Sequence, residues 1–340
     1  MAQLTGPAER VRADGSAVGS SVGGAPAVGG SPAVTASPSN KMNPTSAESA
    51  AAAREHVASQ MTTATVTAQA PAPASSASAS ESGSSPSPSS SAAPILIGVG
   101  VGPGDPELLT LQAVRILRDA DVVFAPTTSL DKSSRAEQIV LAATGVQARR
   151  LVFALDDTGG LTPRRAAAWD DAGRSVLDAF ANGADVVAFA TLGDPNVYST
   201  FAYLAQTVAT LRTDVIVRTA AGITAMQDLA ARLALPLVEG REPLTLLPAT
   251  AGADTVSRAL AGPGTVVVYK GGRHMADLAA AVDFAGRSAC TVLGTDLGLP
   301  TEHIAPLHPA QPAANPPAAA PYFTTLIAPP PHRRGRGGAL

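Results

Sequence analysis

The short segment Gly193-Asp194-Pro195 combines three residue types that suit a ligand-binding turn. It closely follows the apolar run 186–190, which is short, β-branched and aromatic and therefore predicts a buried strand. In open α/β sheets, ligands bind at the carboxyl ends of the strands, where this turn would lie. Glycine lets a ligand approach the backbone, and aspartate accepts hydrogen bonds from a ligand or caps the next helix. The same residues are common in ordinary turns, so this segment alone does not identify a site.

A glycine-rich turn, Gly98-Val-Gly-Val-Gly102, coincides with the end of the strand expected at 95–101. This spacing suggests a dinucleotide fold, and a NAD(P)-dependent oxidoreductase is therefore one alternative function. Two details weigh against it. The third glycine of the fingerprint falls on Pro103 or on Asp105, depending on the glycine from which one counts. The acidic residue that should end the second strand and hold a ribose is also missing, because that strand ends Phe124-Ala125-Pro126.

Metal and hydrolase chemistry find little support in the sequence. No Gly-x-Ser-x-Gly elbow is present, and no paired metal-ligand spacing occurs among the histidines, which are His56, His274, His303, His308 and His332. We therefore expect no protein-bound metal. The single cysteine, Cys290, excludes a disulfide framework within the chain and fits a reducing, cytoplasmic location. It lies in an apolar stretch, which favours a small core residue in a strand.

The composition of the chain changes abruptly at residue 94. Residues 1–93 contain no Phe, Trp, Tyr or Ile and only one Leu, so they cannot bury enough apolar surface to fold, and we expect a disordered arm. The following residues are rich in Ile, Leu, Val and Phe, and predict an N-terminal α/β domain over 94–235 and a C-terminal one over 236–329. Residues 330–340 are expected to be a basic, disordered tail. A non-catalytic scaffold that carries the arm remains a further alternative.

The charge and hydropathy of the chain limit its partners. The formal net charge is −3, so no polybasic surface is expected to bind nucleic acid or an anionic membrane. No apolar run approaches the 18 or so residues of a membrane span. We therefore expect neither nucleic acid nor a membrane as a partner.

Strands and helices alternate over the first predicted domain, which favours a mostly parallel sheet with right-handed crossovers. Its strands are expected at 95–101, 121–125, 149–153, 186–190 and 214–218, and its helices after Asp105 and at 134–144, 163–182, 198–211 and 221–233. Strands are denser in the second domain and predict a mixed sheet with two helices, at 254–260 and 275–284. Its strands are expected at 244–247, 264–270, 289–293 and 322–327, and the Pro/Ala-rich segment 307–321 is expected to be a loop that continues from the Pro-rich stretch containing His303.

Four segments together resemble the tetrapyrrole methylases, in the same order and at plausible spacing over 94–328. They are GVGVGPGDPELLTL from Gly98, ADVVF from Ala120, GDPNVYST from Gly193 and AGITAM from Ala221. One such segment is weak evidence, whereas four in order are specific. The chain departs from the family at Ala221, where a proline is usual, and this loses some rigidity before Thr224.

The resemblance implies two α/β domains with S-adenosylmethionine (SAM) in the cleft between them, and transfer of its methyl group to a carbon of a tetrapyrrole. Within the family, the segments 191–200 and 242–250 and Trp169 are most similar to the members that methylate C20 of precorrin-2 in cobalamin biosynthesis. The cobalt-containing substrate (cobalt-factor II) and another ring position remain alternatives. The resemblance also implies a homodimer. The residues carried over as cofactor-binding are Pro103, Leu192, Gly193, Asp194, Val197, Thr224, Ala225, Tyr269 and Lys270.

The chemistry implied by the resemblance needs a proton acceptor and cationic groups. Tyr198 is a candidate for the acceptor because it follows the cofactor loop, although a packing role is as compatible with its position. A tetrapyrrole rich in carboxylates should be met by basic side chains in loops or at strand ends. Besides Lys270, the candidates for substrate binding are Lys132, Arg135, Arg241 and Arg273.

Overall fold

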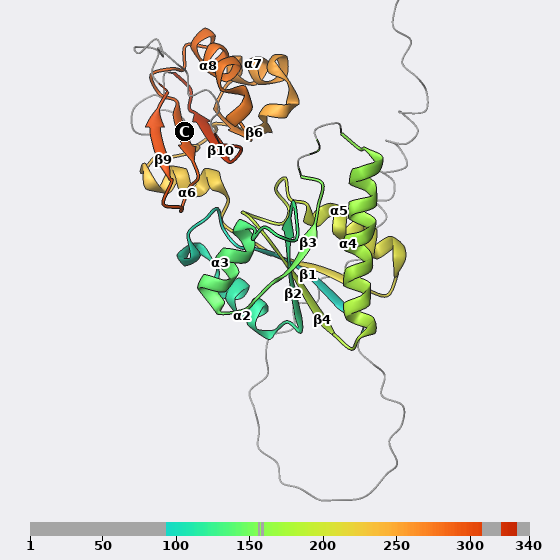
Figure 1. Cartoon of the computed structure of the whole chain (residues 1–340). Coiled ribbons are helices and arrows are strands. Elements are labelled where there is room, and N and C mark those ends of the chain that lie inside the picture. The colour runs from blue at the N-terminus through green and yellow to red at the C-terminus, as the bar shows by residue number, and fades with distance from the viewer. Residues whose placement is uncertain (1–92, 156, 158–159, 308–320, 332–340) are drawn as a thin grey trace, which may run out of the picture. The chain divides into compact units, whose positions relative to one another are not determined.

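The computed structural model describes residues 93–155, 157, 160–307 and 321–331. Nearly all of the arm expected at 1–93 and of the tail expected at 330–340 lies outside these residues, as does most of the loop expected at 307–321. The described residues form two five-stranded sheets with helices, which confirms the α/β fold class (Figure 1).

The first sheet is parallel throughout, as the alternating pattern predicts. Its strands run in the order β3-β2-β4-β1-β5. In the register, Val99 of β1 lies beside Ala190 of β4 on one side and beside Ala220 of β5 on the other, so these three strands end at one edge. The strands are β1 (Ile95–Gly100), β2 (Val122–Thr127), β3 (Arg149–Val152), β4 (Val186–Thr191) and β5 (Ile216–Ala220).

Helices cover both faces of the first sheet (Figure 1). One face packs on α2 (Leu111–Asp119) and α3 (Arg135–Thr144), and the other on α4 (Pro163–Ala181) and α5 (Phe201–Leu211). Because side chains alternate along a strand, every strand at the centre of the sheet contributes to both cores. This burial on two sides explains why β4 reads as an unbroken apolar run in the sequence.

The helix expected directly after Asp105 is wrong in its start. Asp105 caps only a 3₁₀ turn, Pro106–Leu108, through a hydrogen bond of 2.9 Å from the backbone N–H of Glu107 to Oδ1. The chain then becomes extended at Leu109, and Thr110 caps α2 by accepting a hydrogen bond of 3.0 Å from the backbone N–H of Ala113. No α-helix therefore begins at the glycine-rich turn, whereas a dinucleotide fold places a helix N-terminus there to bind pyrophosphate.

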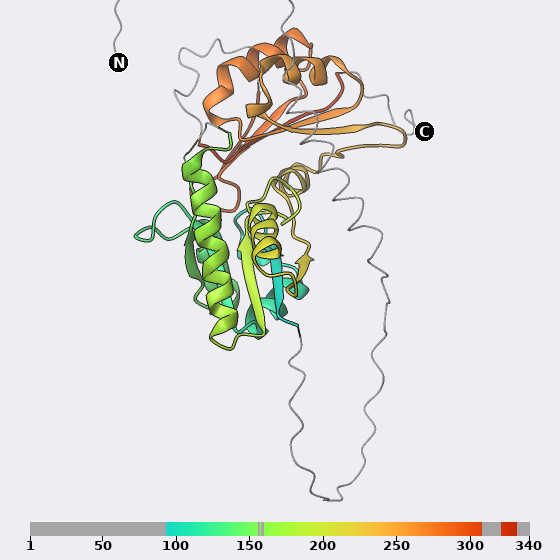
Figure 2. The ribbon, with the colours of Figure 1, turned by 90° about the vertical axis from the view of Figure 1, so that its right-hand side faces the viewer.

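The second sheet is mixed, as expected, with the order β6-β7-β10-β8-β9. Only β6 and β7 pair in parallel, and the other neighbours are antiparallel. One face packs on α7 (Ala253–Ala261) and α8 (Met275–Phe284), as Figure 2 shows. The strands are β6 (Leu244–Pro248), β7 (Thr265–Tyr269), β8 (Val292–Thr295), β9 (His303–Pro306) and β10 (Thr324–Ala328).

Two expectations for the second sheet are corrected. His303 begins an edge strand, β9, instead of lying in a loop. The strand forms because β8 pairs with it, and a short Pro-containing segment carries no sequence signal for such a partner. The strand predicted at 289–293 begins only at Val292, so Cys290 lies in the turn before it. Its side chain is half-buried, with Sγ 3.2 Å from the carbonyl oxygen of Arg287.

The other face of the second sheet packs on α6 (Ala225–Arg232), which follows β5 of the first sheet. Leu229 of this helix is fully buried and clusters with Val267 and Ile327. The helix thus begins at the edge of one sheet and buries its apolar face on the other. The domain boundary expected between residues 235 and 236 follows this helix and stays a prediction.

A buried arginine ties several loops of the second sheet together. Arg287 is 2% exposed, and its Nη1 donates to the carbonyl oxygens of Gly264 and Ala328 at 2.8 and 2.9 Å. Its Nη2 donates to the carbonyl oxygen of Gly262 at 2.6 Å. Burial lowers the pKa of Arg287 because it disfavours the charged guanidinium. No carboxylate among the described residues forms an ion pair with it.

Among the described helices, none combines the length and the apolar character needed to cross a membrane.

Candidate functional site

At the ends of β1, β4 and β5, the backbones of Gly100, Gly193 and Gly222 are in direct contact. A Cβ atom on Gly100 would lie 2.5 Å from the carbonyl oxygen of Gly193 and 2.6 Å from Cα of Gly222. A Cβ atom on Gly222 would lie 2.1 Å from the same oxygen. We call these residues the glycine junction. The glycine-rich turn whose spacing suggested a dinucleotide fold therefore serves close packing between loops.

Asp194 fixes the glycine junction with both carboxylate oxygens. Its Oδ1 accepts a hydrogen bond of 2.8 Å from the backbone N–H of Asn196, within its own turn. Its Oδ2 accepts one of 2.9 Å from the backbone N–H of Gly222, in the loop after β5. The carboxylate thus holds the loop that the unusual Ala221 leaves without a proline, and Asp194 positions backbone in addition to facing a pocket.

A pocket of about 240 Å³ opens beside the glycine junction and is lined by loops from both sheets. It brings together, at this edge, the segments after β4, before α6 and at the end of β7. Its lining includes every residue that the family resemblance assigns to the cofactor: Pro103, Leu192, Gly193, Asp194, Val197, Thr224, Ala225, Tyr269 and Lys270. Their role in binding stays a prediction, but their convergence is a property of the structure.

Thr224 and Tyr269 hold the first turn of α6 against the pocket. Thr224 donates hydrogen bonds of 2.9 Å to Oε1 of Gln227 from both its backbone N–H and its hydroxyl. The phenol oxygen of Tyr269 accepts a hydrogen bond of 3.1 Å from the backbone N–H of Met226. Burial raises the pKa of Tyr269, so the ring stays neutral at physiological pH and serves as a fixed acceptor at the helix start.

Tyr198 lines the same pocket in a left-handed backbone conformation, with φ of 50°. Its hydroxyl donates a hydrogen bond of 3.2 Å to the carbonyl oxygen of Leu246 in β6. Burial raises the pKa of the Tyr198 phenol above its ordinary value of 10.0. A base must be deprotonated before it accepts a proton, so a neutral phenol that already donates its hydrogen fits a positioning role better.

The Tyr198→Phe variant tests this role. A positioned general base contributes about 10²–10⁴-fold. A positioning residue contributes less, so the variant is expected to keep the methyl transfer that the family resemblance implies within about tenfold of the wild type. The measurement is single-turnover methyl transfer across the pH range 6–9. The matched control is Tyr203→Phe, in α5 but outside the lining of the pocket. A loss of more than about a hundredfold confined to Tyr198→Phe would restore this residue as the proton acceptor.

The predicted substrate-binding cations separate into two groups. Arg135 and Lys270 line the pocket, whereas Lys132, Arg241 and Arg273 are exposed and lie outside its lining. The Arg135 guanidinium is already engaged: Nη2 lies 2.5 Å from Oδ1 of Asp296 and its Cζ atom lies 4.2 Å from the centre of the Phe323 ring. Arg135 therefore joins α3 to the loop after β8.

Sequence reasoning missed the aromatic pair Tyr322 and Phe323, which lines the pocket immediately before β10. The two rings meet edge to face at 5.2 Å and remain 46% and 44% exposed. The available signal was two adjacent aromatic residues after a long Pro/Ala-rich segment, in a chain with only 4% aromatic residues. Half-exposed aromatic rings in a pocket are typical of binding surfaces.

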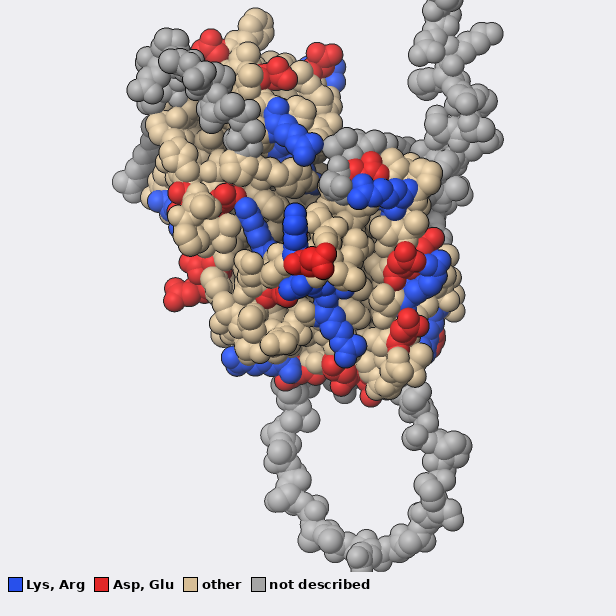
Figure 3. Space-filling view, in the orientation of Figure 1, with Lys and Arg blue, Asp and Glu red and all other residues tan. Residues whose placement is uncertain are grey.

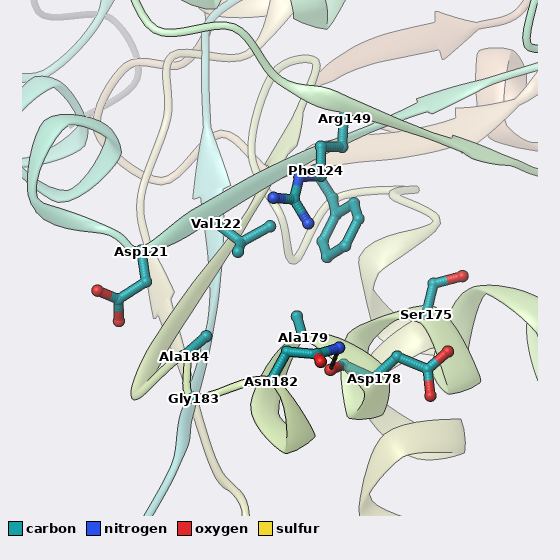
Figure 4. A pocket seen from close by; sticks show the side chains of 10 residues that line it. All are labelled: Asp121, Val122, Phe124, Arg149, Ser175, Asp178, Ala179, Asn182, Gly183 and Ala184. Atoms are coloured by element: carbon teal, nitrogen blue, oxygen red, sulfur yellow. Dashed lines mark hydrogen bonds between the residues drawn. The ribbon is translucent and has the colours of Figure 1, made fainter.

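A second hollow, of about 400 Å³, lies at the opposite edge of the first sheet (Figure 4). Its lining comes from the starts of β2 and β3 and from the last turns of α4. The Asp121 carboxylate already has partners there: its Oδ2 accepts hydrogen bonds of 2.9 and 2.8 Å from the backbone N–H groups of Asp185 and Val186. The amino edge of a parallel sheet is not where such folds place their ligands. Within the described residues, no cluster of His, Cys, Asp or Glu could hold a metal ion.

Comparison with known proteins identifies a family that the chain matches. The family model described as Tetrapyrrole (Corrin/Porphyrin) Methylases matches residues 95–309. The chain is 29% identical over 230 residues to the cobalt-precorrin-2 C(20)-methyltransferase of Salmonella typhimurium, which covers 66% of this chain and 91% of that protein. It is 36% identical over 146 residues to a probable cobalt-precorrin-2 C(20)-methyltransferase of Methanocaldococcus jannaschii, covering 43% of this chain and 60% of that protein.

Two further relatives extend the comparison. The chain is 30% identical over 191 residues to a precorrin-2 C(20)-methyltransferase of Sinorhizobium sp, which covers 54% of this chain and 76% of that protein. Among solved structures, a cobalt precorrin-4 methyltransferase superposes with a TM-score of 0.50 at 20% identity, covering 69% of this chain and 94% of that chain. This last similarity supports the fold alone.

Proposed function

The chain belongs to the tetrapyrrole (corrin/porphyrin) methylase family, and we propose on this premise that it transfers a methyl group from SAM to C20 of precorrin-2, giving precorrin-3A. The reaction belongs to cobalamin biosynthesis. The observation that carries the proposal is the single pocket in which all the residues assigned to the cofactor meet. The named relatives support C20 as the position of transfer, because each carries that position in its name.

The lining of this pocket fits SAM. Small and apolar side chains such as Pro103, Val197 and Ala225 suit an adenosyl group, and backbone at Gly193 with the Thr224 hydroxyl offers polar groups for the amino-acid part. SAM supplies a methyl group that its sulfonium already activates. The protein's own contribution is then to bind and orient, and well-oriented proximity lowers a barrier by roughly 7–11 kcal/mol.

Methyl transfer to C20 needs no reactant besides SAM and the tetrapyrrole. The electron pair of C20 forms the new carbon–carbon bond while the carbon–sulfur bond breaks, which leaves S-adenosylhomocysteine. A proton then leaves C20. The glycine junction acts here by holding the loops after β1, β4 and β5 at fixed distances, because near-attack geometry is lost with displacements of about 1 Å.

Finer points of the proposal rest on the relatives and on composition. Relatives named for the cobalt-loaded and for the metal-free substrate are similarly distant from the chain, so cobalt-loaded substrate is the second candidate. We further propose a cytoplasmic homodimer that requires no resident metal and binds neither nucleic acid nor a membrane. Figure 3 supports the absence of a nucleic-acid partner, because basic and acidic side chains are interspersed over the visible face.

The decisive experiment incubates the purified full chain with SAM and either precorrin-2 or its cobalt complex. The expected result is a mass gain of one methyl group per tetrapyrrole, and the faster of the two substrates identifies the physiological form. Calorimetry with SAM and with NAD(P) is the parallel measurement. Tight NAD(P) binding without SAM binding, or no methylated product from either substrate, would overturn the proposal.

A further inference from the structure

Two non-glycine residues with left-handed backbones meet in the pocket. Tyr198 has φ of 50° and Lys270 has φ of 61°. Nζ of Lys270 lies 5.8 Å from the centre of the Tyr198 ring. Bulky side chains rarely adopt positive φ, and such strain persists only where the surroundings enforce it, most often at functional sites. Tyr198 and Lys270 thus present their side chains to the same pocket from two constrained turns.

The backbone around Lys270 shows how this direction is imposed. Lys270 is the first residue after β7, and the next N–H, of Gly271, donates a hydrogen bond of 3.2 Å to the carbonyl oxygen of Thr324. That bond fastens the turn to the start of β10, beside Tyr322. The Tyr322 ring centre lies 6.0 Å from Nζ of Lys270, so two tyrosine rings flank the ammonium group.

The two cations of the pocket differ in their electrostatic state. Arg135 is neutralised by Asp296 at 2.5 Å. Lys270 forms no ion pair with any carboxylate in the described part of the chain, and contacts only ring faces at the outer limit of cation–π distance. Its positive charge is therefore available to an anionic ligand that enters the pocket.

We propose that Lys270 pairs with a carboxylate of the tetrapyrrole substrate and is a specificity-determining residue for it. This assignment rests on the proposed function, and it chooses substrate binding over the cofactor contact, the two roles that the sequence suggested for Lys270. Charge complementarity decides between the two ligands. SAM carries a sulfonium and an ammonium against one carboxylate, so a nearby lysine gains little from it, whereas a polycarboxylate tetrapyrrole offers uncompensated negative charge.

The test compares Lys270→Met, Lys270→Arg and Lys270→Gly with the wild type. Lys270→Met keeps the length of the side chain but removes its charge, and is expected to raise KM for the tetrapyrrole at least about tenfold, as loss of one charge-assisted hydrogen bond does. The dissociation constant of SAM, measured by calorimetry, is expected to stay within about twofold of that of the wild type. Lys270→Arg should retain most of the affinity, and the increase of KM with salt should be weaker in Lys270→Met.

Lys270→Gly and a matched control separate binding from folding. Glycine adopts positive φ freely, so Lys270→Gly is expected to raise KM as Lys270→Met does while melting no lower than the wild type. The control is Ala234→Gly, which relieves a similar backbone (φ of 46°) beyond the end of α6 and outside the pocket lining. It should leave KM unchanged. An unchanged KM in Lys270→Met, or weaker SAM binding without a change in KM, would overturn the assignment.

A binding measurement keeps this test separate from the test of the proposed function. Uroporphyrin, a stable polycarboxylate tetrapyrrole, is titrated into each variant and followed by its fluorescence. Weaker binding by about tenfold in Lys270→Met supports the assignment even if the wild type methylates neither precorrin. Equal binding by Lys270→Met and the wild type, or no binding by the wild type together with an absence of turnover, contradicts it.

Discussion

The Gly222→Ala variant is expected to lose SAM binding by at least about tenfold and to lose roughly 2–3 kcal/mol of folding stability. The added Cβ atom would lie 2.1 Å from the carbonyl oxygen of Gly193 and 2.7 Å from Cα of Gly100. All the nearest atoms belong to backbone, so no side chain can rotate away, and the loops after β1, β4 and β5 must move apart. The hydrogen bond from the Gly222 N–H to Asp194 would be displaced with them.

Calorimetry with SAM and thermal melting measure the two effects in the same preparation. The matched control is Gly286→Ala, where φ is 67° but no atom lies within 4 Å of the added Cβ. That variant should lose only about 1–2 kcal/mol from backbone strain and bind SAM like the wild type. SAM binding by Gly222→Ala that equals the wild type would show that the glycine junction does not shape the cofactor site.

The Arg287→Met variant is expected to lower the free energy of unfolding by about 3 kcal/mol. Methionine fills a similar volume but leaves the carbonyl oxygens of Gly262, Gly264 and Ala328 without their donors. Each unsatisfied buried acceptor costs about 1–3 kcal/mol. This loss is partly offset because the variant no longer buries an unneutralised charge, the same desolvation that lowers the pKa of Arg287.

Urea unfolding, with Arg258→Met as the control, measures this difference. Arg258 is exposed on α7 of the same sheet, and its replacement should change stability by less than about 0.5 kcal/mol. Equal stability of Arg287→Met and the wild type would mean that the desolvation of the guanidinium cancels its hydrogen bonds.

Much of the first sheet could be predicted because its signals are local. The run 186–190 is buried on both faces and must be apolar throughout, and the turn at Gly193 must contain residues that tolerate a sharp change of direction. The order of the glycine-containing segments along the chain then placed their turns at one edge of a parallel sheet. The pocket that unites them in the structure follows from that topology.

Other features depend on partners distant in sequence. The edge strand that begins at His303 forms because β8 offers it hydrogen bonds, and nothing in the segment itself shows this. The expected helix after Asp105 is interrupted at Leu109, where the chain becomes extended before Thr110 starts a second cap. Arg135 was expected to be free for a substrate, but it reaches Asp296, which lies 161 residues away.

The sequence by itself determined the family, the α/β class and nine of the residues that line the pocket, because each depends on residue type and on spacing within short segments. Only the tertiary structure decided what those residues do to one another. It showed that Gly100 of the glycine-rich turn packs against the backbone of Gly193 and Gly222. It also showed that Asp194 accepts hydrogen bonds from its own turn and from the loop after β5. It also left Lys270, rather than Arg135, with an unpaired charge among the described residues, because charge compensation depends on distances that spacing along the chain does not encode.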